Sequence, residues 1–261
     1  MDRAGSVEEN LVEFFRHFAR ARSSGEVREM PGVSIASCGA SIHTFNGAFL
    51  SEPVAEGAGL LERRILTASV HYAARGLRWA FWAAEHKLPA AIRKKSRAVF
   101  QAHGLSLAYE NPGMAADRLL PPSRRLPNLD FRRVEKEPER LDFCFVNAAA
   151  FRMPFEWCRE LYNLEPLWND QFTGWVGYVN GRPVTAAATL AVSGAVGVYC
   201  VATLPEEGRK GYAEAVVRHA LKKVREEPGF ERTILQSSAE GLSLYKQMGY
   251  EVVTRFQVYS T

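Results

Sequence analysis

A short stretch that contains glycine and basic residues, Gly208-Arg209-Lys210-Gly211, lies between an apolar run of strand type and the start of an amphipathic helix. The first turn of a helix has unpaired backbone N–H groups and carries the positive end of the helix dipole. Glycine lets the backbone approach an anion closely, and Arg209 and Lys210 add positive charge there. The stretch therefore predicts a cradle for a phosphate or pyrophosphate group. Similar strand-to-helix turns also occur in α/β proteins without such a ligand, and that alternative stays open.

The composition suits an anionic ligand and excludes several protein classes. The chain has 261 residues, a formal net charge of +4, 47% hydrophobic and 24% charged residues, as expected for a globular protein of one large or two ordinary domains. It has no dense Lys/Arg tract, so nucleic acid is not an expected partner. The first residues include acids and no uninterrupted apolar run, which argues against a secretion signal or membrane span and favours a cytoplasmic protein.

The cysteines and histidines show no metal-ligand spacing. The cysteines are scattered, without a CxxC or His-paired arrangement, and are expected to be reduced and mostly buried: Cys38, Cys144, Cys158 and Cys200. The histidines form no His-x-x-x-His or triad-like pattern and are interpreted as structural. No metal site is therefore predicted.

The first half of the chain is expected to alternate helices and short strands. Periodicity and turn residues predict a helix over 8–22, a hairpin of strands 32–37 and 42–50, a helix over 57–75, a strand over 77–84, a helix over 87–103 and a strand over 105–109. The following stretch is rich in proline and basic residues and predicts a linker. We therefore expect domains at 1–115 and 129–261, joined by a linker at 116–128.

The second half predicts a strand over 129–134 and helices within 140–163 that Pro154 divides. Three strands follow, over 175–179, 184–192 and 196–202, the first two joined by an Asn-Gly turn typical of hairpins. After the glycine loop come a helix, a strand over 233–236, a short helix over 239–248 and a strand over 250–259.

In this order of elements the second half resembles the GNAT superfamily of acyl-CoA-dependent N-acetyltransferases, over roughly Leu129–Thr261. The loop motif of that family is Gln or Arg, two residues, Gly, one residue, then Gly or Ala. Gly211-Tyr212-Ala213 fits its second part, whereas Gly208 stands where Gln or Arg is expected and Arg209 comes one place later. The segment Ser237–Tyr250 looks like the closing segment of the family, with Ser238 where Asn is frequent and Tyr245 where a general acid is usual.

The resemblance implies an α/β (α+β) fold with a mixed, mostly antiparallel sheet flanked by helices, and acetyl-CoA as cosubstrate without a metal. It implies that Tyr245 protonates the departing CoA thiolate, although helical periodicity alone favours an ordinary half-buried aromatic residue. The implied cofactor contacts are main-chain groups of the strand end for the pantetheine arm and the loop for the pyrophosphate: Val201, Ala202, Thr203, Gly208, Arg209, Lys210, Gly211, Tyr212, Ala213 and Ser238.

The first half repeats the same order in shortened form, with Phe49-Leu50 where Val201-Ala202 stand. Its equivalent loop, 51–59, contains glycines but carries Glu52 and Glu56 and no base, and these acids would repel a pyrophosphate. We interpret this half as a degenerate domain of a tandem that walls the acceptor cleft. A coincidental α/β order is the alternative.

The predicted function is acetyl transfer from acetyl-CoA to a primary amine of a small molecule or peptide, in a ternary complex of a monomer or homodimer without membrane or nucleic acid. A CoA-binding regulator without transfer activity, or an acyltransferase with another acyl chain or a hydroxyl acceptor, remain alternatives. Four residues are candidate bases for the amine: Glu156, Glu160, Asp170 and Tyr199. Four aromatic residues are candidates for the floor of the acceptor pocket, with core packing as the other use: Phe151, Phe155, Trp157 and Trp168.

Overall fold

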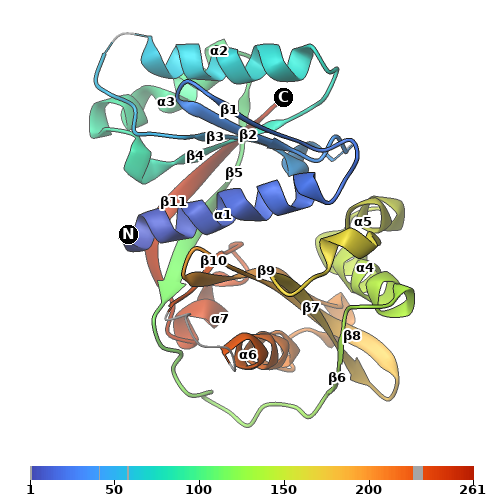
Figure 1. Ribbon diagram of the computed structural model, residues 1–261. Coiled ribbons are helices and arrows are strands. Elements are labelled where there is room, and N and C mark those ends of the chain that lie inside the picture. Colours follow the sequence, from blue (N-terminus) through green and yellow to red (C-terminus); the bar gives the residue numbers. More distant parts are fainter. Residues whose placement is uncertain (1, 41, 58, 226–231) are drawn as a thin grey trace. The chain divides into compact units, whose positions relative to one another are not determined.

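The computed structural model describes residues 2–40, 42–57, 59–225 and 232–261, so Ala58 of the expected loop over 51–59 lies outside the described residues. The chain forms two compact units (Figure 1). The first unit is Met1–Gly113 with Val252–Thr261, and the second unit is Met114–Glu251. This division differs from the expected one at the last strand, which belongs to the first unit, and at the connecting stretch, which belongs to the second.

The first unit contains the elements α1 (Arg3–Arg20), β1 (Glu26–Met30), β2 (Val33–Ser37), β3 (Asn46–Leu50), α2 (Leu60–Ala73), β4 (Ala80–Ala84), α3 (Ala90–Ala102), most of β5 (Ser106–Ala116) and β11 (Glu251–Ser260). Strands β1, β2 and β3 pair antiparallel, β3 and β4 pair parallel, and β4 pairs antiparallel with β11. Helix α1 begins earlier than expected because Asp2 caps it, accepting a hydrogen bond from the Gly5 N–H at 2.7 Å.

Alternation along these strands separates two apolar layers. Phe49 and Trp82 are register partners, and both rings contact Phe15 of α1 edge-on, with centroids 5.0 Å and 5.4 Å away. The neighbouring pair, Ala48 and Phe81, belongs to the fully buried core that α2 and α3 complete. Because successive side chains of a strand point to opposite faces, one pair packs on α1 and the next pair packs toward α2 and α3.

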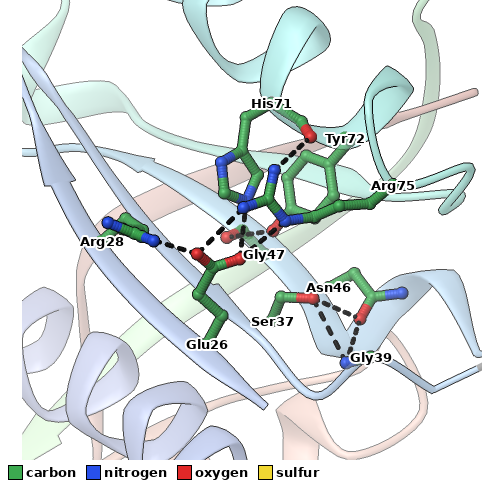
Figure 2. Close-up of polar contacts among 9 residues, drawn as sticks. All are labelled: Glu26, Arg28, Ser37, Gly39, Asn46, Gly47, His71, Tyr72 and Arg75. Atoms are coloured by element: carbon green, nitrogen blue, oxygen red, sulfur yellow. Dashed lines mark hydrogen bonds and ion pairs between the residues drawn. The ribbon is translucent and has the colours of Figure 1, made fainter. Parts of the chain in front are cut away.

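A buried amide fixes the connection between β2 and β3 (Figure 2). Asn46 is fully buried, and its Oδ1 accepts hydrogen bonds from the Ser37 hydroxyl at 2.9 Å and the Gly39 N–H at 3.1 Å. Its Nδ2 donates to the carbonyls of Ala40 and Arg78, each at 2.9 Å. The side chain thus supplies partners to backbone groups that no strand pairs.

Ion pairs cover the outer strand of the same sheet. Strand β1 was not expected from the sequence, because Glu26–Met30 is polar and only partly buried. Figure 2 shows Glu26 of β1 between Arg28 and Arg75. The Arg75 Nε lies 2.7 Å from a Glu26 carboxylate oxygen, and the Arg28 Nε lies 2.5 Å from the other. Charged side chains of this kind protect an edge strand from pairing with another chain.

The second unit contains β6 (Asp130–Arg133), α4 (Glu137–Phe151), α5 (Phe155–Tyr162), β7 (Phe172–Val179), β8 (Arg182–Val192), β9 (Ala195–Thr203), α6 (Tyr212–Arg225), β10 (Arg232–Gln236) and α7 (Leu242–Gln247). Strands β6 to β9 pair antiparallel in chain order, and β10 pairs parallel with β9. Within this unit α4 and α6 cover opposite faces of the sheet (Figure 1). The mixed, mostly antiparallel α+β architecture and the division of α4 from α5 at Pro154 are confirmed.

The connecting stretch between β5 and β6 is bound to the second unit at several points. Asp117 forms an ion pair with Arg232 of β10 at 2.7 Å. The Leu120 carbonyl accepts a hydrogen bond from Arg218 of α6 at 2.8 Å, and the Leu120 N–H donates to the Met248 carbonyl at 2.9 Å. The proline-rich composition that predicted a linker therefore belongs to an irregular segment with fixed contacts. Within the described residues, none of the helices has the length and apolar character needed to cross a bilayer.

Candidate active site

Strand β9 carries a bulge at the position where the chemistry is expected. Its register with β8 shifts, so that Ala186 faces Ala202 whereas Ala188 faces Tyr199, which leaves one extra residue on β9. Cys200, within the bulge, has a φ of 52°, in the left-handed region that residues with side chains seldom occupy. Bulges and left-handed backbone of this kind are concentrated at functional sites, where they redirect the strand.

The bulge coincides with the end of the parallel pairing between β9 and β10. Their register runs from Ala195 with Arg232 to Val198 with Leu235, although β9 continues to Thr203. Val201, Ala202 and Thr203 therefore lie beyond the paired part of the two strands. On the other side the Ala202 carbonyl is held by the Thr185 hydroxyl at 2.8 Å. Extended backbone released from one neighbour can hydrogen-bond an extended ligand.

The glycine loop follows directly and joins β9 to α6. After a turn of 3-10 helix over Pro205–Glu207, Gly208 has φ −60° and ψ 156°, while Arg209 and Gly211 have φ values of 66° and 88°. A Cβ at Gly208 would meet only the Pro205 carbonyl, at 3.2 Å, so the backbone does not require glycine there. The left-handed φ of Arg209 is the conformation that favours glycine. The backbone would therefore suit a residue with a side chain at 208 and glycine at 209, which is the reverse of the order that the sequence has.

The charges of the loop are mostly paired. The Lys210 ammonium lies 2.6 Å from a Glu207 carboxylate oxygen, and this partner raises the pKa of Lys210. Arg182 of β8 forms an ion pair with Glu206 and lies 3.6 Å from Glu207. The sequence prediction counted Arg209 and Lys210 as available to a pyrophosphate. The structure shows Lys210 engaged by an acid of the same loop.

Ser238 and Tyr245 come from the segment after β10. Because β9 and β10 run parallel, their carboxyl ends lie at the same edge of the sheet, and this segment starts from that edge. The Ser238 hydroxyl accepts a hydrogen bond from the Gly241 N–H at 3.2 Å, so it shapes the turn that leads into α7. Tyr245 on α7 is 7% exposed, and its ring contacts that of Tyr250 edge-on at 5.8 Å. Burial raises the pKa of Tyr245, so its hydroxyl, which is protonated at neutral pH in any tyrosine of ordinary pKa, stays protonated to higher pH.

Residues that sequence reasoning did not select surround the bulge. The Cys200 thiol lies 3.6 Å from the Tyr162 hydroxyl, and burial raises the pKa of this thiol to about 12. Tyr162 is buried and packs edge-on against Phe143 at 5.3 Å. Cys200 is therefore held as a neutral thiol and is poorly suited to act as a nucleophile. No local signal marked the bulge, because its left-handed residue is not a glycine.

The candidate bases and pocket residues have different environments. Tyr199 is buried, and burial raises its pKa, so it is poorly suited to accept a proton at neutral pH. The Asp170 carboxylate is 99% exposed and lies 3.5 Å from Arg133. Glu156 is exposed and Glu160 is half-buried. None of the four is thereby identified as the base.

The aromatic candidates also separate. The Trp168 ring packs against that of Phe143, with centroids 5.0 Å apart, and its indole N–H donates to the Tyr162 carbonyl at 2.8 Å. Trp168 is therefore used in core packing, which was the alternative to a place in the acceptor pocket. Phe151 and Trp157 are 47% and 42% exposed and therefore do not belong to the core. Phe155 is half-buried.

The strands of the first unit that correspond to β8 and β9 have no bulge in their pairing. Strands β2 and β3 pair from Val33 with Leu50 to Ser37 with Asn46 without a register shift. The Lys87 ammonium donates to the Leu50 carbonyl at 2.6 Å, and the Val54 N–H donates to the Lys87 carbonyl at 2.9 Å. These bonds connect the end of β3 to the segment that follows β4, whereas in the second unit the register of β9 with β10 ends at Val198 and Leu235.

The following loop is also held internally. The guanidinium of Arg64 donates to the carbonyls of Glu52 and Pro53, at 2.7 Å and 3.2 Å, and lies 2.9 Å from the Glu52 carboxylate. The Arg64 side chain is 4% exposed. The Arg64 guanidinium is therefore already bound to backbone carbonyls and to a carboxylate of this loop.

Part of the chain matches a known protein family, and its fold matches that of several solved structures. Residues 140–250 match the model of the acetyltransferase (GNAT) family. A GCN5-related N-acetyltransferase from Kribbella flavida is similar in structure with a TM-score of 0.73 at 18% identity, over 97% of this chain and 94% of that one. One from Sphaerobacter thermophilus has a TM-score of 0.60 at 14% identity, over 88% and 76% of the two chains.

A tandem GNAT protein from the clavulanic acid biosynthesis pathway has a TM-score of 0.56 at 11% identity, over 98% of this chain and 95% of that one. No curated protein matches the chain in sequence. At these identities the solved structures establish the fold alone. Residues 140–250 thus match the acetyltransferase (GNAT) family, and the chain has the fold of solved GNAT proteins.

Proposed function

We propose that the second unit transfers an acetyl group from acetyl-CoA to a primary amine, by direct attack in a ternary complex. The observation that carries the proposal is the bulge at Cys200 together with the end of the β9–β10 pairing at Val198 and Leu235. This geometry leaves Val201 to Thr203 as extended backbone that leads directly into the glycine loop. A pantetheine arm offers amide groups that such backbone can pair with, and its pyrophosphate would lie on the loop and the start of α6.

The chemistry then rests mostly on positioning. The amine nitrogen attacks the thioester carbonyl, the C–S bond breaks, and the CoA thiolate takes a proton. Tyr245 is the proposed donor of that proton, because a phenol is protonated at neutral pH and Tyr245 lies in the segment that follows β10, whose carboxyl end lies at the same edge of the sheet as that of β9. The proton that the amine loses goes to a base or to water. The first unit is proposed to be a degenerate partner that binds no CoA, since Lys87 and Arg64 occupy its strand ends and loop.

A CoA-binding regulator without transfer activity is the second candidate, favoured by the paired charges of the loop and by Gly208. Calorimetric titration with acetyl-CoA separates the candidates when it is combined with a thiol-release assay over a panel of amines. Acetyltransferase activity predicts saturable binding and amine-dependent release of CoA thiol. Binding without thiol release for any amine would favour the regulator. Absence of binding to acetyl-CoA and to CoA would refute both.

A further inference from the structure

The glycine loop carries no net charge of its own. Glu206 and Glu207 balance Arg209 and Lys210, and Lys210 lies 2.6 Å from its acid partner. Arg182, which reaches the loop from β8, is paired with the same two acids, so the loop and this arginine together carry a single net positive charge. A further cation beside the loop would strengthen its attraction for a pyrophosphate, which carries two negative charges.

Arg124 of the connecting segment supplies such a cation. Its Nη1 donates a hydrogen bond to the Arg209 carbonyl at 3.3 Å. Its Nη2 lies 2.9 Å from the position that a Cβ on Gly211 would occupy, so the guanidinium lies in the space that this glycine leaves open. A guanidinium has several N–H donors, and the bond to Arg209 uses only one of its nitrogens. Among the described residues, no carboxylate forms an ion pair with Arg124.

The backbone that carries Arg124 is held both before and after this residue in the sequence. Leu120 is hydrogen-bonded to Arg218 of α6 and to the Met248 carbonyl after α7. Leu129, on the far side of Arg124, packs against Val184 and Ala215 in a buried cluster. Because the segment is anchored within the second unit, the guanidinium can remain at the loop with little loss of chain entropy when a ligand binds.

We propose that Arg124 binds the pyrophosphate of CoA and replaces the Gln or Arg that the family motif has at Gly208. This inference rests on the proposed function of the second unit. A guanidinium can bond two phosphate oxygens at once, and its hydrogen bond to the Arg209 carbonyl keeps it at the loop on which the pyrophosphate is proposed to lie.

The test compares Arg124→Gln with Arg125→Gln, which removes the same charge from the adjacent exposed residue. Calorimetric titrations use CoA and 3′-dephospho-CoA, in low and in physiological salt. Arg124→Gln is expected to weaken both ligands by about tenfold in low salt, and by less at higher salt because added ions screen the charge. Arg125→Gln should change either affinity less than about twofold. Arg124→Lys, which keeps the charge, should recover part of the loss.

Each other outcome overturns a stated part of the inference. Equal affinity of wild type and Arg124→Gln for CoA would refute it while leaving CoA binding intact. A loss for CoA but not for 3′-dephospho-CoA would assign Arg124 to the 3′-phosphate and refute the pyrophosphate assignment. A wild-type protein that binds neither ligand refutes the proposed function itself. Melting temperatures of the variants show whether any loss comes from unfolding.

Discussion

Replacement of Gly211 by alanine tests the glycine loop directly. Gly211 has a φ of 88°, and an L residue in the left-handed region costs about 1 to 2 kcal/mol relative to glycine. The added Cβ would also lie 2.9 Å from the Arg124 guanidinium and would displace it. Such a displacement costs little stability, because the contact is exposed, but it changes the surface presented to a phosphate.

Gly194→Ala is the matched control for backbone strain. Gly194 lies in the turn between β8 and β9, has a φ of 73°, and has no atom within 4 Å of an added Cβ. Both variants should therefore lose about 1 to 2 kcal/mol of unfolding free energy in urea denaturation. Only Gly211→Ala should lose affinity for CoA, by about tenfold or about 1.4 kcal/mol, in calorimetric titration. If the two variants bind CoA equally well, the loop is not the phosphate cradle and our interpretation of it is wrong.

Three further predictions concern catalysis and stability. Tyr245→Phe should lower the rate of thiol release by about 10- to 100-fold and leave CoA affinity unchanged, and unaltered turnover would rule out its acid role. Asn46→Ala should lower the unfolding free energy by about 3 kcal/mol, because it removes the partner of three backbone groups, one in a buried and two in partly buried hydrogen bonds. The control Asn147→Ala should cost about 1 kcal/mol, since that amide oxygen accepts no hydrogen bond among the described residues, and equal losses would contradict the argument. Burial raises the pKa of the Cys144 and Cys200 thiols from 9.0 to about 12. Only the unfolded chain then releases these protons just above pH 9, so stability should fall as pH rises, by about 1 kcal/mol for each thiol at pH 10, and a melting temperature that rises from pH 8 to 10 would contradict this.

Local patterns predicted most helices and strands because each has its own periodicity. The stripe of Phe14, Phe15 and Phe18 predicted α1, and alternation predicted β3 and β4. Strand β1 was not predicted because this edge strand is largely polar and lacks the apolar alternation by which a strand is recognised in a sequence. Strand β5 was expected to end at Tyr109, whereas it continues through Pro112 and Gly113 to Ala116. Residues that usually interrupt strands can be accommodated where the neighbouring strand and core compensate for them.

The site was predictable only where it depends on consecutive residues. The order of strand, loop and helix around Gly211 is local, and the structure has it in that order. The contact of Arg124 with Arg209 joins residues that are far apart in the chain, and nothing in a proline-rich segment indicates where its side chains lie. The bulge at Cys200 likewise depends on how β8 and β9 pair rather than on the type of residue within it.

The place of β11 has a consequence for the order in which the chain can fold. Its residues Phe256 to Ser260 pair with Ala84 to Ala80, and Tyr259 stacks on Phe100 of the first core with ring centroids 3.8 Å apart. During synthesis, the first unit must therefore wait for nearly all of the second unit to leave the ribosome before its sheet is complete. Until then the edge of β4 stays open to pairing with other chains.

The same arrangement determines how the chain can be divided. A cut between the two halves would separate β4 from β11 and leave the first core without Tyr259. The second half produced alone would carry β11 as an unpartnered apolar strand. Each unit has its own set of internal contacts, but a single cut in the chain does not yield both units whole, because the first unit includes the last residues of the chain.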